Sequence, residues 1–140
     1  MNRTDKITKV MNYLINIRHF ANSVSKEVKV DFPKSDINCS EAFYLILLNE
    51  NSGGLTMSEL SAFAKVDKSL TTRIIKKLLD KGYIYKNTDD LSTRNYKIKL
   101  TDLGIDKAND IDGVLITKYD SFVKKYTKEE LKRLEDAFEL

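Results

Sequence analysis

The sequence predicts a mainly α-helical domain with one small β-hairpin. Apolar residues recur every three or four positions over most of the chain, which is the period of a helix. Three segments have the pattern of a helix N-terminal capping box: Asn-Cys-Ser-Glu at 38–41, Thr-Met-Ser-Glu at 56–59 and Thr-Lys-Glu-Glu at 127–130. Residues 95–100 instead alternate polar and apolar side chains, as a strand does.

Length and composition indicate one ordinary globular domain spanning residues 1–140. The chain is 41% hydrophobic and 32% charged, which is typical of such domains. Its longest apolar run, residues 43–48, is too short to cross a bilayer, and its polar N-terminus is unlike a signal peptide. The single cysteine cannot form an internal disulfide. We therefore expect a soluble cytoplasmic protein with no membrane partner.

The first predicted helix covers residues 4–30. Its apolar stripe includes Ile7, Val10, Leu14 and Ile17, and it should end before Pro33, which disfavours helical geometry at the preceding residue. Such a long stripe is more than a small domain easily covers. We expect this face to be buried partly between molecules.

A second helix should begin at the Asn38–Glu41 capping box and end before Gly53-Gly54. Residues 43–48 within it are apolar nearly all round. This pattern predicts a central helix.

Residues 55–101 follow with a short helix, a tight turn, a longer helix and a hairpin. Thr56 should open the short helix, which runs to about Ala64, and Asp67 should cap the longer one. Gly82 suits the left-handed position after that helix. Two strands, at residues 83–86 and 95–100, are separated by a polar loop. Helix, turn, helix and basic hairpin in this order form a DNA-reading module.

The charge of this segment supports the same interpretation. Residues 65–99 contain ten basic and four acidic residues, whereas the whole chain has a net charge of only +3, so the remainder is mildly negative. A positive segment on a negative body is typical of a polyanion binder. Lysines that simply solvate a surface are the alternative, and the charge bias alone favours nucleic acid only mildly.

Two helices complete the predicted chain. One begins at Thr101-Asp102 and should turn six apolar residues inward: Leu103, Ala108, Ile111, Leu115, Tyr119 and Phe122. Gly104 lies in its first turn and Gly113 in its middle. The Thr127–Glu130 capping box opens the last helix, with Leu131, Leu134 and Phe138 on its apolar face.

The complete order of elements resembles the MarR family of bacterial winged helix-turn-helix regulators, including its staphylococcal Sar relatives. Three segments carry the resemblance: Leu55-Thr56-x-x-Glu59-Leu60, the run from Ser69 to Leu78, and Arg94-Asn95-x-x-Ile98-x-Leu100-Thr101-x-x-Gly104. It implies a winged helix-turn-helix at residues 55–101, flanked by dimerisation helices at 4–31 and 102–140. A homodimer would bind a palindromic operator in double-stranded DNA, with half-sites roughly 10 bp apart.

The expected DNA contacts lie on the second helix of the module and on its hairpin, which is the wing. They are Lys68, Ser69, Thr71, Thr72, Arg73, Lys76 and Lys77 on the helix, and Lys86, Arg94 and Lys97 in the wing. Arg73 could bind guanine, Thr72 could touch a thymine methyl, and the lysines would bind phosphates. A solvated helix face is the alternative for Lys77 and Lys81.

One position of the wing departs from the family pattern. Relatives place an aspartate two residues before the wing arginine, where Ser92 stands here. Either Asp90 substitutes for it or the wing is less ordered.

The resemblance also implies a small aromatic or anionic effector, with Tyr13, Arg18 and Tyr44 as candidate ligands. Aromatic residues at helical spacing are the ordinary content of a core, which is the alternative. We expect no metal or cofactor, because one histidine and one cysteine cannot supply a zinc site without several carboxylates. A structural or surface role is favoured for His19. Burial is favoured over thiol sensing for Cys39.

Three other classes of function are less favoured. A winged helix used for protein contacts would expose apolar residues where Lys68, Thr72 and Arg73 stand. An architectural DNA protein would bind without regard to sequence. No nucleophile–base pair, phosphate-binding glycine loop or metal spacing indicates an enzyme.

Overall fold

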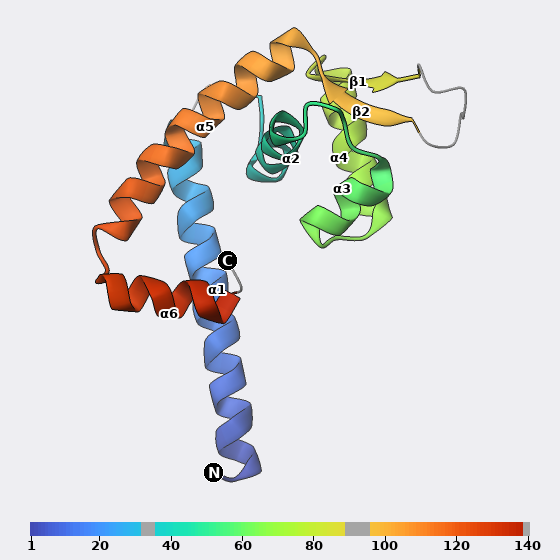
Figure 1. Ribbon diagram of the computed structural model, residues 1–140. Coiled ribbons are helices and arrows are strands. Elements are labelled where there is room, and N and C mark those ends of the chain that lie inside the picture. The colour runs from blue at the N-terminus through green and yellow to red at the C-terminus, as the bar shows by residue number, and fades with distance from the viewer. Residues whose placement is uncertain (32–35, 89–95, 139–140) are drawn as a thin grey trace. The chain divides into compact units, whose positions relative to one another are not determined.

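The computed structural model describes residues 1–31, 36–88 and 96–138, and it divides into two compact units. The first unit, Met1–Cys39, contains helix α1 (Arg3–Asp31). The second, Ser40–Leu140, contains α2 (Cys39–Glu50), α3 (Met57–Ala64), α4 (Lys68–Asp80), β1 (Ile84–Asn87), β2 (Lys97–Leu100), α5 (Asp102–Val123) and α6 (Lys128–Phe138). The predicted class, mainly helical with a small hairpin, is confirmed (Figure 1).

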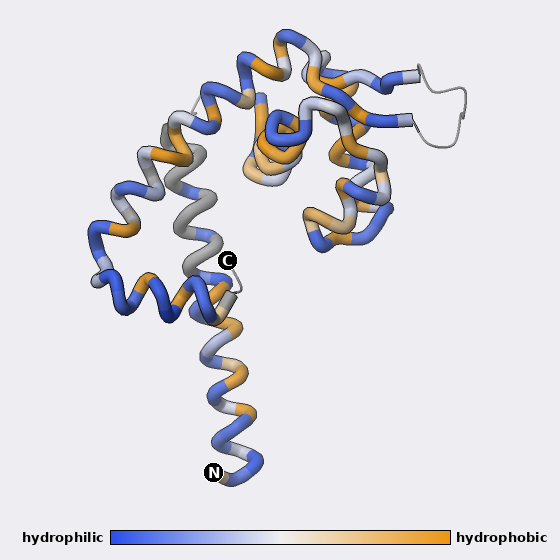
Figure 2. Tube along the Cα trace, in the orientation of Figure 1, coloured by the Kyte–Doolittle hydropathy of each residue, from blue (hydrophilic) through white to orange (hydrophobic). Residues whose placement is uncertain are grey.

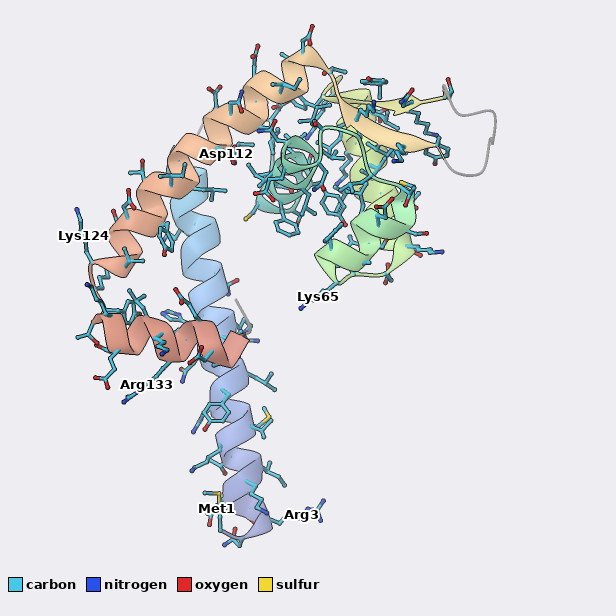
Figure 3. All side chains as sticks on the ribbon, viewed as in Figure 1. Met1, Arg3, Lys65, Asp112, Lys124 and Arg133 are labelled. Atoms are coloured by element: carbon cyan, nitrogen blue, oxygen red, sulfur yellow. The ribbon has the colours of Figure 1, made fainter. Side chains whose placement is uncertain are left out.

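Helix α1 confirms the prediction of a long N-terminal helix. Its apolar residues alternate with hydrophilic ones along its first half (Figure 2). Ile7, Val10, Met11, Leu14 and Ile17 are each 51–56% exposed. These side chains therefore form an apolar stripe without cover in the single chain. The predicted stop at Pro33 lies outside the described residues.

Helix α2 supplies much of the core of the second unit. Leu45 and Leu48 are almost completely buried, whereas Phe43 at the start of the predicted apolar run is 47% exposed. The helix is thus central, although it is not buried all round. The side chain of Asn49 donates hydrogen bonds to Asn109 and Asp112, which joins α2 to α5.

Helices α3 and α4 begin with the caps that the sequence predicts. Thr56 Oγ1 accepts a hydrogen bond from the Glu59 amide, and the Glu59 carboxylate accepts one from the Thr56 amide. Asp67 Oδ1 accepts from the Leu70 amide at 2.8 Å. Between the helices, Lys65 adopts the left-handed conformation with φ of 55°. That single residue lets the chain reverse within the turn, and α3 packs against α4.

The two strands pair antiparallel, with Ile84 opposite Leu100 and Asn87 opposite Lys97. Each strand lies close to its predicted position. A further bridge joins Leu55 to Ile98, whose amide and carbonyl groups exchange two hydrogen bonds. The linker before α3 thus continues the hairpin, an element that the sequence analysis missed. Ile98 is fully buried, so the base of the wing is anchored in the core.

Gly82 lies before the hairpin, and helix α5 follows it. Gly82 has φ of +79°, which confirms its predicted left-handed conformation. Ala108 and Ile111 are buried as expected, but Leu103, Leu115 and Tyr119 are 37–59% exposed, so their predicted inward position is wrong for the single chain. Helical period alone cannot tell a face that packs within one chain from a face that does not. The side chain of Phe122 lies outside the description.

The predicted cap of the last helix is also confirmed. Thr127 Oγ1 accepts a hydrogen bond from the Glu130 amide, and Glu130 Oε1 accepts from the Thr127 amide. Leu134 of α6 is 36% exposed.

Candidate nucleic-acid interface

Helix α4 separates a buried apolar face from an exposed polar one. At 100° per residue, Ile74, Ile75 and Leu78 lie on one side, and all three are buried. The exposed polar and basic side chains are Lys68 at the first position of the helix and, away from the buried side, Ser69, Thr72, Arg73, Lys76 and Lys77. Six of the seven predicted contacts on this helix therefore share one accessible surface. We call these six residues the α4 polar face.

Thr71 is the exception. We expected it to contact DNA, and the structure shows that this expectation was wrong. Its side chain is fully buried, and its Oγ1 lies 2.8 Å from the hydroxyl of Tyr44. Thr71 and Thr72 have the same chemistry, but a rotation of 100° along the helix places them on different faces. Thr71 is part of the core beneath the α4 polar face.

The hydroxyl of Thr72 has a defined role within the helix. Its Oγ1 donates a hydrogen bond to the carbonyl of Lys68 at 2.8 Å. This bond occupies the hydroxyl proton and restrains the side-chain rotamer. Thr72 therefore presents a methyl group and an acceptor oxygen, and its hydroxyl has no proton left to donate.

The wing adds further cationic side chains. Lys86 and Lys97 are exposed on β1 and β2, and Lys99 is half-buried. The ammonium group of Lys86 lies 4.8 Å from the centre of the Tyr96 ring, a cation–π contact that restrains a long side chain. Arg94, Ser92 and Asp90 lie outside the described residues. The two expected consequences of Ser92, substitution by Asp90 or a less ordered wing, therefore stay predictions.

Lys81 has a different surrounding from the other basic residues of this segment. Its ammonium group forms an ion pair with Glu41 Oε2 at 2.6 Å, and the Glu41 side chain is 3% exposed. Neither alternative considered for Lys81, a solvated face or a phosphate contact, describes this arrangement. The partners are 40 positions apart, and no local pattern in the sequence indicates that they pair.

The remaining candidate ligands do not form one described site. Tyr13 and Arg18 are exposed on α1. Tyr44 is only 2% exposed and its hydroxyl contacts Thr71, so its expected role as an effector ligand is corrected to a core position. Cys39 is a half-buried free thiol. No group of three or more metal-binding side chains occurs within the described ranges.

Comparison with known proteins shows what this arrangement is similar to. The sequence model of the MarR family matches residues 37–96, which contain α2, α3, α4 and β1. The structure also matches a MarR protein from Peptoclostridium difficile with a TM-score of 0.82 and 25% identity, over 91% of this chain and 83% of that one. Over residues 37–96 the chain is similar to the MarR family.

The chain is also similar to two further proteins. It is 35% identical over 83 residues to the HTH-type transcriptional regulator BilQ of Clostridioides difficile, a match that covers 59% of this chain and only 55% of that protein. The crystal structure of the Staphylococcus aureus MepR–DNA complex matches with a TM-score of 0.83 and 19% identity, over 90% of this chain and 93% of MepR. At that identity the second likeness establishes the fold alone.

One negative finding concerns membranes. Within residues 1–31, 36–88 and 96–138, no helix combines the length and apolar character needed to span a bilayer.

Proposed function

We propose that this protein is a DNA-binding transcriptional regulator of the MarR family and that it acts as a homodimer on a palindromic operator. The observation that supports DNA binding most directly is the α4 polar face. Its residues are all exposed while the opposite side of the same helix is buried. A recognition helix needs this division, because it must rest on its own domain and still present donors to base edges.

Charge on the wing extends the proposed surface. Lys86 and Lys97 are exposed on neighbouring strands, where they would bind phosphates beside the groove that α4 enters. Such contacts fix the register of the protein on DNA without reading its sequence. Base discrimination would then rest on Arg73, Thr72, Ser69 and Lys68. For Arg94, which lies outside the described residues, the proposal is a contact in an adjacent minor groove.

Dimerisation is proposed for residues 4–31 and 102–140. The apolar stripe of α1 is exposed in the single chain, as are Leu115, Ile116 and Tyr119 of α5. An exposed apolar stripe of this length is a marker of a protein–protein interface. A two-fold dimer would present two α4 polar faces to half-sites roughly 10 bp apart.

The proposal includes control of DNA binding by a small-molecule effector. Tyr13 and Arg18 are exposed on α1, and we propose that they bind an aromatic or anionic ligand. Binding would alter operator affinity by favouring one separation of the two reading heads. Thermal shift with a panel of phenolic and anionic compounds tests it, and Tyr13→Ala and Arg18→Ala should abolish any response.

The deciding experiment is selection of bound duplexes from a random pool, followed by titration against salt. We expect a palindromic winner whose affinity falls when Arg73 is changed to alanine. Arg3→Ala is the matched control, because Arg3 is also exposed but lies at the start of α1. Sequence-independent binding would indicate an architectural DNA protein instead. No binding to any duplex would favour a winged helix that contacts proteins.

A further inference from the structure

Two polar contacts join α2 to α4 beneath the α4 polar face. The hydroxyl of Tyr44 lies 2.8 Å from Thr71 Oγ1, and both side chains are buried. The carboxylate of Glu41 accepts a hydrogen bond from the ammonium group of Lys81 at 2.6 Å. The other buried side chains of α4 are the apolar residues Ile74, Ile75 and Leu78.

The two contacts reach opposite ends of α4. Glu41 and Tyr44 are three residues apart on α2, and so they lie on the same face of that helix. Thr71 is in the first turn of α4, whereas Lys81 is its C-cap. At 1.5 Å per residue these two positions are separated by about 15 Å. Helix α2 thus contacts the first turn of α4 through Thr71 and the C-cap of α4 through Lys81.

Hydrogen bonds constrain a helix differently from apolar contacts. Apolar burial is non-directional and tolerates small rotations of a helix about its axis. A hydroxyl–hydroxyl bond requires a defined distance and direction. A rotation of about 20° would move a side-chain tip at a radius of about 6 Å by about 2 Å, which is enough to break a hydrogen bond to a base edge.

Thr71 precedes two residues of the α4 polar face, Thr72 and Arg73. We infer that Tyr44 is a positioning residue for base recognition, because its hydrogen bond to Thr71 sets the rotation of α4 about its axis. The inference rests on the proposed function, since it concerns how α4 reads DNA. Tyr44 itself touches no base. Its effect reaches DNA through the direction in which Thr72 and Arg73 point.

The test removes the hydrogen bond without leaving a buried hydroxyl unpaired. The double variant Tyr44→Phe with Thr71→Val does so with almost no change in side-chain volume, and such paired apolar replacements are close to neutral for stability. Affinity is measured for the selected operator and for a random duplex, together with thermal unfolding. We expect the ratio of the two affinities to fall about tenfold, with random-duplex affinity within about twofold of wild type and an unfolding temperature within a few degrees.

Ser61→Ala is the matched control within the same unit. The Ser61 hydroxyl is also buried, on α3, and it finds no hydrogen-bond partner among the residues that the structure describes. Its removal deletes a buried hydroxyl without cutting a contact between α2 and α4. Discrimination between operator and random duplex should stay at the wild-type value.

Each contrary outcome identifies what has failed. If wild type discriminates and the double variant discriminates equally well, the role of Tyr44 is overturned while the proposed function stands. Equal losses of operator and random-duplex affinity together with stability would show that Tyr44 is merely structural, which also overturns it. So would a loss of discrimination in Ser61→Ala as large as that of the double variant. If wild type does not discriminate at all, the proposed function and this inference fail together.

Discussion

A Cβ atom added to Gly104 would lie 1.9 Å from the carbonyl oxygen of Tyr83. The same carbonyl accepts a hydrogen bond from the Thr101 amide at 3.0 Å, and Thr101 Oγ1 accepts from the Gly104 amide at 3.1 Å. The first turn of α5 therefore rests directly on the backbone that enters β1. Because the obstacle is backbone, no side-chain rotation can relieve it.

This contact predicts a strong effect of Gly104→Ala. The helix must move away from the hairpin, which should lower the free energy of unfolding by about 2 kcal/mol or more, at the upper end of ordinary point mutations. Denaturant unfolding measures the change. Gly113→Ala is the matched control in the same helix, because among the described residues no atom outside its own helical turns lies within 4 Å of its added Cβ. That variant should be stabilised by about 0.5–1 kcal/mol. Equal effects of the two substitutions would contradict the role of the close contact.

Removal of the Lys81 side chain should lower stability, whereas removal of the Lys76 side chain should change the salt dependence of DNA binding. Lys81→Ala leaves the buried Glu41 carboxylate without its ammonium partner, so we expect a loss of about 1–3 kcal/mol in stability. The salt dependence of DNA binding should not change. Lys76→Ala on the α4 polar face should leave stability within about 0.5 kcal/mol and reduce the logarithmic salt slope by about one per reading head. The opposite pattern would place Lys81 at the phosphate backbone.

The exposed stripe of α1 predicts the oligomeric state. Leu14→Glu places a charge where the proposed interface is apolar, and it should convert the dimer into a monomer of 16.1 kDa in sedimentation analysis. Asn12→Glu is the control, because it adds the same charge on the other side of the same helix. Leu14 is 56% exposed in the single chain, so the monomer should keep its helical content. A wild-type protein that sediments as a monomer would contradict the dimer itself.

The hydrogen bond inside α4 predicts how Thr72 reads DNA. Because its hydroxyl donates to the Lys68 carbonyl, we expect the methyl group of this exposed side chain to be the feature that meets a thymine methyl. Thr72→Val keeps that methyl and should bind the selected operator within about twofold of wild type, whereas Thr72→Ser should bind several-fold more weakly. Competition binding with matched duplexes measures both. If the serine variant binds better than the valine variant, the hydroxyl rather than the methyl carries the contact.

Local interactions explain why much of the fold could be predicted. The caps at Thr56, Asp67 and Thr127 involve partners three residues away, and the period of apolar residues is set by the geometry of one helix. Both kinds of signal are contained in a few adjacent residues. The order of helices and hairpin, and the basic character of α4 and the wing, are therefore properties of the sequence itself.

Tertiary structure decided which side chains these elements present. Thr71 and Thr72 have the same chemistry, but Thr71 lies on the buried side of α4, where its Oγ1 contacts the hydroxyl of Tyr44, 27 positions away, whereas Thr72 is exposed. The Lys81–Glu41 pair, the Leu55–Ile98 bridge and the contact of Gly104 with Tyr83 likewise join distant positions. Such contacts depend on how elements meet in space, which no local pattern specifies. The sequence alone thus determined the helices, the hairpin and their charge, and only the folded chain separated the exposed polar residues of α4 from the side chains buried beneath them.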